Sequence, residues 1–89
     1  METLASEHPA YTPGPMSLKL FEEEQLYIAP GLQQIATFSK LVMEKGRGAI
    51  LIDVDGKEYI DFVAGVCVAS IGHGHPKYAA ALAQQASAI

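Results

Sequence analysis

The stretch that decides the fold runs from residue 48 to residue 76 and reads GAILIDVDGKEYIDFVAGVCVASIGHGHP. Its first part, Ala49–Val54, is rich in β-branched residues, which predicts a strand. Asp55 and Gly56 follow, and this dipeptide favours a two-residue type I′ turn, in which both central residues need a positive φ. Lys57–Phe62 then returns as the second arm, so the stretch predicts a β-hairpin.

The residues before the hairpin predict a helix and an arm. Ser17–Ile28 carries apolar residues on one helical face, and Ser17 is typical of an N-cap. The helix is expected to end at Ala29, because Pro30 disfavours the α region for the residue before it. Three of the five prolines lie in the first 16 residues, which predicts an extended arm there.

The remaining segments complete an expected α+β fragment. Leu41–Lys45 is predicted as a short strand that Gly46–Gly48 interrupts, and Gln33–Ser39 as a linker. Small apolar residues in Val63–Ile71 predict close packing against another surface. Pro76 suits the first position of a helix, which runs to the last residue with its apolar pattern unfinished. The expected order is therefore arm, helix, hairpin and helix.

Composition restricts the class of protein. The chain has 89 residues, 49% hydrophobic and 18% charged, which is typical of a globular protein. A net charge of −4 argues against nucleic acid or an anionic membrane as the main partner. Cys67 is the single cysteine and has no internal disulfide partner. With no signal-peptide pattern and no long apolar stretch, the chain is expected to be cytoplasmic.

The sequence offers few groups for catalysis. His73 and His75 could begin a zinc site, but zinc needs three or four ligands and no neighbouring residue supplies the others. The expected structural role of both histidines is bonding to the loop backbone, so no metal site is predicted. Cys67 lies in an apolar run and has no charged neighbour in sequence, which favours a packed residue over a catalytic thiolate. The residues alone therefore predict no self-sufficient active site.

The ordered motifs in residues 48–76 resemble the opening of class III pyridoxal-phosphate aminotransferases. That family shows a hairpin of the pattern G-x-x-x-x-D-x-D/E-G-x-x-Y-x-D, then a small residue with glycine, then GHxHP before an alanine-rich helix. The matching residues are Gly48, Asp53, Asp55, Gly56, Tyr59, Asp61, Gly65, Gly72, His73, His75, Pro76 and Gln84. Together with the preceding helix and proline–glycine turn, the resemblance extends from residue 17 to residue 89.

The resemblance implies the start of the small domain of a fold-type I enzyme. In this division, residues 1–16 are the arm, 17–30 the first helix and turn, 31–75 the linker and hairpin, and 76–89 the beginning of the helix that leads toward the large domain. The full-length relative uses pyridoxal 5′-phosphate, an amino donor and a 2-oxo acid acceptor, and it is a homodimer. Its catalytic lysine and its cofactor-binding residues come later in the chain, so the 89 residues alone are expected to be inactive.

The resemblance also suggests which residues lie near substrate. The residue after the glycine of the small-residue motif often lines the substrate pocket in relatives, which here indicates Val66, with Cys67 beside it. The hairpin would hold the Gly65–Cys67 loop over the cofactor cleft. A glutamate-1-semialdehyde aminomutase-like isomerase is an alternative, but Leu32–Thr37 lacks the arginine of that subgroup. A second alternative is a truncated, non-catalytic module that associates with a full-length subunit.

Overall fold

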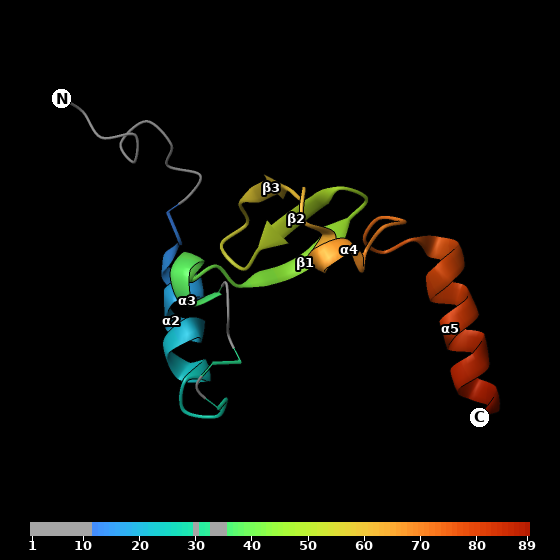
Figure 1. Ribbon diagram of the computed structural model, residues 1–89, viewed down its shortest axis with the longest axis horizontal. Coiled ribbons are helices and arrows are strands. Elements are labelled where there is room, and N and C mark those ends of the chain that lie inside the picture. The colour runs from blue at the N-terminus through green and yellow to red at the C-terminus, as the bar shows by residue number, and fades with distance from the viewer. Residues whose placement is uncertain (1–11, 30, 33–35) are drawn as a thin grey trace.

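The computed structural model describes residues 12–29, 31–32 and 36–89. Figure 1 shows a small sheet in the middle, with one helix on either side. The elements in chain order are α2 (Pro15–Glu24), α3 (Ala36–Ser39), β1 (Met43–Arg47), β2 (Ile50–Asp53), β3 (Glu58–Ile60), α4 (Ala64–Cys67) and α5 (Pro76–Ala88). The α+β class and the hairpin predicted from the sequence are confirmed.

The sheet has three antiparallel strands in the order β1-β2-β3. Arg47 pairs with Ile50 across the tight β1–β2 connection, and Ile50 pairs in turn with Ile60 of β3. The β1–β2 register shifts between Met43 and Lys45, which is a bulge that raises the local twist. Both connections are short hairpins, so the sheet forms from local contacts.

The β2–β3 loop differs from the predicted type I′ turn. The amide of Gly56 donates to the Asp53 carbonyl (3.0 Å), and the amide of Asp53 donates to the Lys57 carbonyl (3.0 Å). Gly56 has a φ of 84°, whereas Asp55 does not share the positive φ that a type I′ turn requires. The loop therefore has three residues and ends in a left-handed glycine, and the predicted two-residue turn was wrong.

The buried carboxylate of Asp53 explains this loop. Its Oδ1 atom accepts the amides of Asp55 and Lys57, each at 2.9 Å. Its Oδ2 atom accepts the Tyr59 hydroxyl at 2.8 Å. Asp53 is completely buried, and these bonds replace the water that its carboxylate loses. They hold the loop backbone in the longer turn.

The first helix starts earlier than predicted. Gly14 is its N-cap and Pro15 its first residue, so the prediction of Ser17 as N-cap was wrong. Ser17 lies inside α2, is completely buried, and accepts the amide of Val42 through its hydroxyl at 3.3 Å. The helix ends at Glu24, before the predicted end at residue 28, and turns follow it.

Three further boundaries differ from the prediction. Residues 15 and 16 of the expected arm belong to α2, while residues 1–11 lie outside the described part. The expected linker contains the single turn of α3, with residues 33–35 outside the described part. Strand β1 runs through Gly46 to Arg47, although Gly46–Gly48 was expected to interrupt it. A glycine in a strand has no side chain to pack, but its backbone can still form the hydrogen bonds of the sheet.

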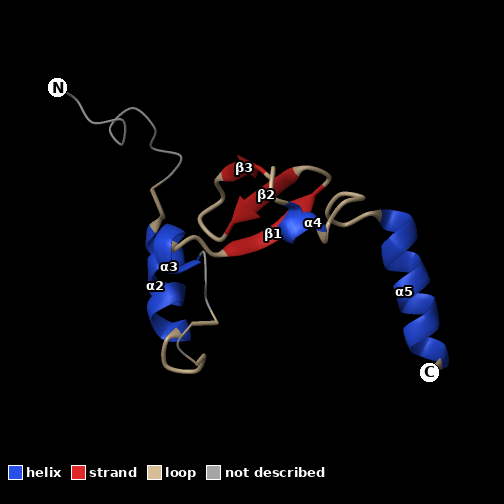
Figure 2. Cartoon of the chain, viewed as in Figure 1, coloured by secondary structure: helices blue, strands red, loops and turns tan. Residues whose placement is uncertain are grey.

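Burial is concentrated where α2 meets the β2–β3 loop. Ser17 and Phe21 are buried on one face of α2, four residues apart, and the N-cap Gly14 is buried too. Asp53, the last residue of β2 before this loop, is buried as well. Every residue of α5 is exposed, and Figure 2 shows this helix standing apart from the sheet. In the described part of the chain, no helix is long and apolar enough to cross a membrane.

Candidate functional site

The candidate site is the loop between Asp61 and His73, at the end of the sheet away from α2. Asp61 follows β3 directly, and its Oδ1 atom accepts the amides of Val63 (3.0 Å) and Ala64 (2.8 Å). An aspartate that binds the amides two and three residues ahead fixes the backbone of a turn. The end of β3 thus determines the direction in which the loop leaves the sheet.

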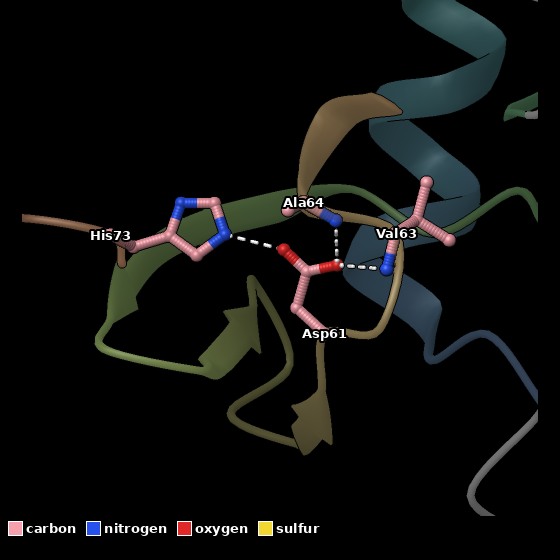
Figure 3. Close-up of polar contacts among 4 residues, drawn as sticks. All are labelled: Asp61, Val63, Ala64 and His73. Carbon is pink, nitrogen blue, oxygen red and sulfur yellow. Dashed lines mark hydrogen bonds and ion pairs between the residues drawn. The ribbon is translucent and has the colours of Figure 1, made fainter. Parts of the chain in front are cut away.

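The other end of the loop returns to the same carboxylate. Figure 3 shows Asp61 between the loop amides on one side and the ring of His73 on the other. The Nε2 atom of His73 lies 2.5 Å from Asp61 Oδ2. The side chain of Asp61 is 9% exposed and that of His73 is 26% exposed, so water has limited access to this contact. One carboxylate therefore joins both ends of a loop of eleven intervening residues.

Backbone bonds fasten the His73 end to the sheet. The amide of His73 donates to the Gly48 carbonyl (2.8 Å), and the amide of Gly48 donates to the His73 carbonyl (2.9 Å). Gly46 makes room for the ring, because a Cβ atom there would lie 2.7 Å from His73 Cβ. A Cβ atom on Gly72 would lie 3.2 Å from Gly48 Cα. Glycines on both sides thus allow the two backbones to approach closely.

The loop holds a left-handed turn where the sequence predicted only a packed apolar segment. All four residues of α4, Ala64, Gly65, Val66 and Cys67, have φ between 52° and 67°. Only Gly65 adopts this region without strain, and each of the other residues costs roughly 1–2 kcal/mol. A β-branched residue such as Val66 at positive φ is a genuine outlier. Such strain persists only where surrounding contacts determine the backbone.

The turn presents its side chains outward. Val66 is 80% exposed, and Cys67 is an exposed free thiol. Within this chain residues 63–71 are largely unpacked, since Val63, Val68 and Ile71 are also more than half exposed, and their packing against another surface stays a prediction. A hollow of about 400 Å³ lies next to the turn, lined by residues 68–74 and Tyr78. The two residues predicted to line a substrate pocket are thus available for contact.

The start of α5 follows the prediction. Pro76 is the first helical residue and His75 is the N-cap, although no side chain caps the helix. The Nδ1 atom of His75 is buried and has no hydrogen-bond partner among the described residues. His73 binds the loop as expected of a structural histidine, but its partner is a carboxylate in addition to backbone. Within the described ranges, no three His, Cys, Asp or Glu residues are placed to hold a metal ion.

Two other motif residues lie at the opposite end of the sheet. Asp55 accepts the amides of Met16 and Ser17, each at 2.9 Å, so it caps the N-terminus of α2. Gly56 completes the loop that carries Asp55. Sequence reasoning assigned both residues to the hairpin alone and missed this capping contact. The contact joins residues 38 and 39 positions apart, a separation that local patterns do not show.

Hydrogen bonds and desolvation shift the pKa values of three side chains, those of Asp61, Asp55 and Tyr59. The hydrogen bond from His73 is the main cause that holds the pKa of Asp61 below its ordinary 3.8, and the amides of Ala64 and Val63 add to it. Desolvation raises the pKa of Asp55, but the bonds from Ser17 and Met16 together lower it below 3.8. Desolvation, followed by the hydrogen bond to Asp53, raises the pKa of Tyr59 to about 12. Both aspartates are thus anionic acceptors at neutral pH.

The lysines do not form a cofactor site in the described part of the chain. Four of them, Lys19, Lys40, Lys45 and Lys77, are exposed. Lys57 is partly buried, and its Nζ atom donates to the Thr12 carbonyl at 2.6 Å. None of these amines lines the hollow beside the turn. The described residues therefore do not form a pyridoxal-phosphate site by themselves.

Comparison with solved structures gives the class of protein. The fold matches the ornithine aminotransferase of Toxoplasma gondii ME49 with a TM-score of 0.71 and 31% identity, covering 98% of this chain and 20% of that one. A small antiparallel sheet followed by a fastened loop and a helix is therefore part of an aminotransferase-type structure. The family model for class-III aminotransferases matches residues 32–89. The chain belongs to the class III aminotransferase family.

Sequence relatives agree with this assignment. The acetylornithine aminotransferase of Methanothermobacter thermautotrophicus is 41% identical over 73 residues, which is 82% of this chain and 18% of that protein. The alanine/serine racemase of Pyrococcus horikoshii is 35% identical over 92 aligned positions, covering all of this chain and 19% of that protein. The chain thus spans about a fifth of the length of these relatives.

Proposed function

We propose that this chain is the N-terminal part of a pyridoxal-phosphate-dependent aminotransferase that moves an amino group from an amino acid or amine to a 2-oxo acid. The observation that carries the proposal is the family match over residues 32–89, which includes the whole fastened loop. The relatives named acetylornithine and ornithine aminotransferase support a donor with a primary amine. The full-length protein is proposed to be cytoplasmic and homodimeric.

The chain's own contribution in this proposal is to shape the substrate pocket. Val66 and Cys67 lie on an exposed turn that is fixed at both ends, which supports a role in contact with the substrate. A short aliphatic side chain at Val66 leaves room and offers no aromatic ring for stacking. The cofactor supplies the electron-withdrawing chemistry, and the residues that hold it belong to the remainder of the enzyme. The sheet and loop form the start of the small domain.

Amino transfer by the full-length protein tests this proposal. A panel of amino donors that includes acetylornithine and ornithine would be incubated with 2-oxo acids and pyridoxal phosphate, and the new amino acid measured by chromatography. We expect transfer by the full-length protein and none by the 89-residue chain, in which four lysines are exposed and Lys57 is bonded to the Thr12 carbonyl. Absence of transfer with every donor by a folded full-length protein would contradict the proposal.

A racemase or epimerase is a second candidate. It is favoured by the alanine/serine racemase match, which extends over the entire chain. The two activities differ in their products: a racemase forms the opposite enantiomer and needs no 2-oxo acid. Incubating L-alanine or L-serine without an acceptor, followed by chiral chromatography, separates them. Accumulation of the D-enantiomer favours the racemase, and dependence on the acceptor favours the aminotransferase.

The truncated-module alternative requires a different observation. Reading the gene beyond the codon for Ile89 separates it from the proposal. A frame that continues with a lysine-bearing cofactor domain supports the enzyme, whereas a stop codon at that point supports the module.

A further inference from the structure

The loop between Asp61 and His73 combines strain with exposure. Three of its residues, Ala64, Val66 and Cys67, lack glycine's freedom and yet adopt positive φ. The amide of Cys67 donates to the Val63 carbonyl (3.1 Å), which is a local bond within the turn. The exposed side chain of Val66 makes no buried contact that would offset the strain. The position of the turn therefore depends on how its two ends are held.

The Asp61–His73 contact joins the two ends of the loop that carries the turn. Asp61 binds the two amides at the beginning of the turn through one oxygen and the His73 ring through the other. His73 is in turn fixed by paired backbone bonds with Gly48. The result is a continuous path from the sheet, through one imidazole and one carboxylate, to the first residue of the turn. Ala64 and His73, nine positions apart, are thus linked through the single carboxylate of Asp61.

We propose that Asp61 and His73 are positioning residues that fix the Val66 side chain at the substrate pocket and thereby set substrate selectivity. This inference rests on the proposed function, because it assumes that Val66 faces the substrate. Neither Asp61 nor His73 needs to touch the substrate. Their effect passes through the left-handed turn, whose strained backbone takes another conformation when one end is released.

The first test is a double-mutant cycle in the full-length protein. Selectivity is measured as the ratio of kcat/KM for acetylornithine to kcat/KM for L-alanine, donors with long and short side chains. We expect His73→Ala to change this ratio about tenfold, mainly through KM. In the Val66→Ala background the same substitution should change it less than about twofold, since the side chain being positioned is gone.

Two further variants separate positioning from general stability. His73→Gln keeps an N–H donor toward Asp61 and should restore most of the original ratio. Asp55→Ala is the matched control, because Asp55 also accepts two backbone amides at 2.9 Å but lies at the other end of the sheet. It should leave the ratio within about twofold. An unchanged ratio in His73→Ala, or an equal change in Asp55→Ala, would overturn the proposal.

A second measurement is independent of catalysis. Amide hydrogen exchange of residues 63–72 in the full-length protein reports whether the turn is held. We expect His73→Ala to accelerate exchange at Cys67 and Ala69 about tenfold and Asp55→Ala to leave it unchanged. No acceleration would contradict the positioning role even if no substrate were turned over. A protein that shows the exchange effect but catalyses no amino transfer would instead contradict the proposed function alone.

Discussion

Single carboxylates link segments that are far apart in this chain. Asp61 joins the two ends of the exposed loop, and Asp55 joins the β2–β3 loop to α2. Helix α2 has no side-chain cap of its own, so Asp55 supplies the acceptor that a serine or aspartate N-cap normally provides. Its negative charge also lies at the positive end of the helix dipole. The sequence pattern of α2 alone could not predict a cap that comes from another element.

We expect substitutions at Asp55 and Gly14 to have non-additive effects on the free energy of unfolding. A Cβ atom on Gly14 would lie 2.2–2.6 Å from the carboxyl atoms of Asp55, so Gly14→Ala should displace the cap. Asp55→Ala should lower the free energy of unfolding of the full-length protein by about 1 kcal/mol, as for other lost caps. Gly14→Ala should cost a similar amount alone and little in the Asp55→Ala background, measured by urea unfolding. Fully additive losses would show that Gly14 does not act through Asp55.

We expect the Tyr59 hydroxyl to ionise only at high pH. Its pKa is raised to about 12, so its neutral form stabilises the fold below the ordinary pKa of 10.0, and this stabilisation is lost as the pH rises through about 12. The absorbance difference between the full-length protein and its Tyr59→Phe variant isolates this ionisation. Asp53→Asn should move it to lower pH, because it removes the charge beside the hydroxyl. Ionisation near pH 10 in the original protein would contradict the buried hydrogen bond.

The strands show which elements a sequence can predict. Ala49–Val54 was predictable because its β-branched run is a local property, and β2 forms within it. The length of the β2–β3 loop was not, because it depends on a buried carboxylate, that of Asp53. The left-handed turn of α4 was missed because three of its four residues do not favour positive φ. The turn begins at amides bound by Asp61, whose other carboxylate oxygen contacts His73, twelve positions further along the chain.

We expect two substitutions of Gly56, in the β2–β3 loop, to lower the free energy of unfolding by different amounts. No atom lies within 4 Å of a Cβ placed there, so the cost comes only from its φ of 84°. Gly56→Ala should lower the free energy of unfolding of the full-length protein by about 1–2 kcal/mol. Gly56→Asn should cost less, because asparagine tolerates the left-handed region better. Equal thermal shifts for the two variants would mean that side-chain crowding, not backbone conformation, limits this position.

The described part of the chain leaves most of its apolar surface uncovered. Phe21 is the one large hydrophobic side chain buried in that part. On α5, Tyr78 and Leu82 are 56% and 52% exposed. Burying side chains of this size contributes about 1.5–3 kcal/mol each, which is large beside a typical domain stability of about 5–15 kcal/mol. The apolar side chains of these helices are therefore available to pack against surfaces outside the described residues.

The 89-residue chain on its own should lack a cooperative thermal transition as a monomer. Its buried apolar surface, centred on Phe21, is too small to offset the conformational entropy of ordering the sheet and α5. Circular dichroism across a temperature range, with the oligomeric state measured by light scattering, checks this. A sharp melt of a monomer with dispersed amide NMR resonances would show that the segment is an autonomous domain.

We propose that this chain shapes the substrate pocket of a class III aminotransferase whose cofactor lysine lies outside residues 1–89. To test this, the protein would be purified from its source in the presence of pyridoxal phosphate and reduced with borohydride. Peptide mass mapping would then locate the modified lysine. We expect one pyridoxyl-modified lysine outside residues 1–89, in a protein much larger than the 9.5 kDa of this segment. A modified lysine within the segment, such as Lys57, or a protein that carries no modified lysine, would contradict it.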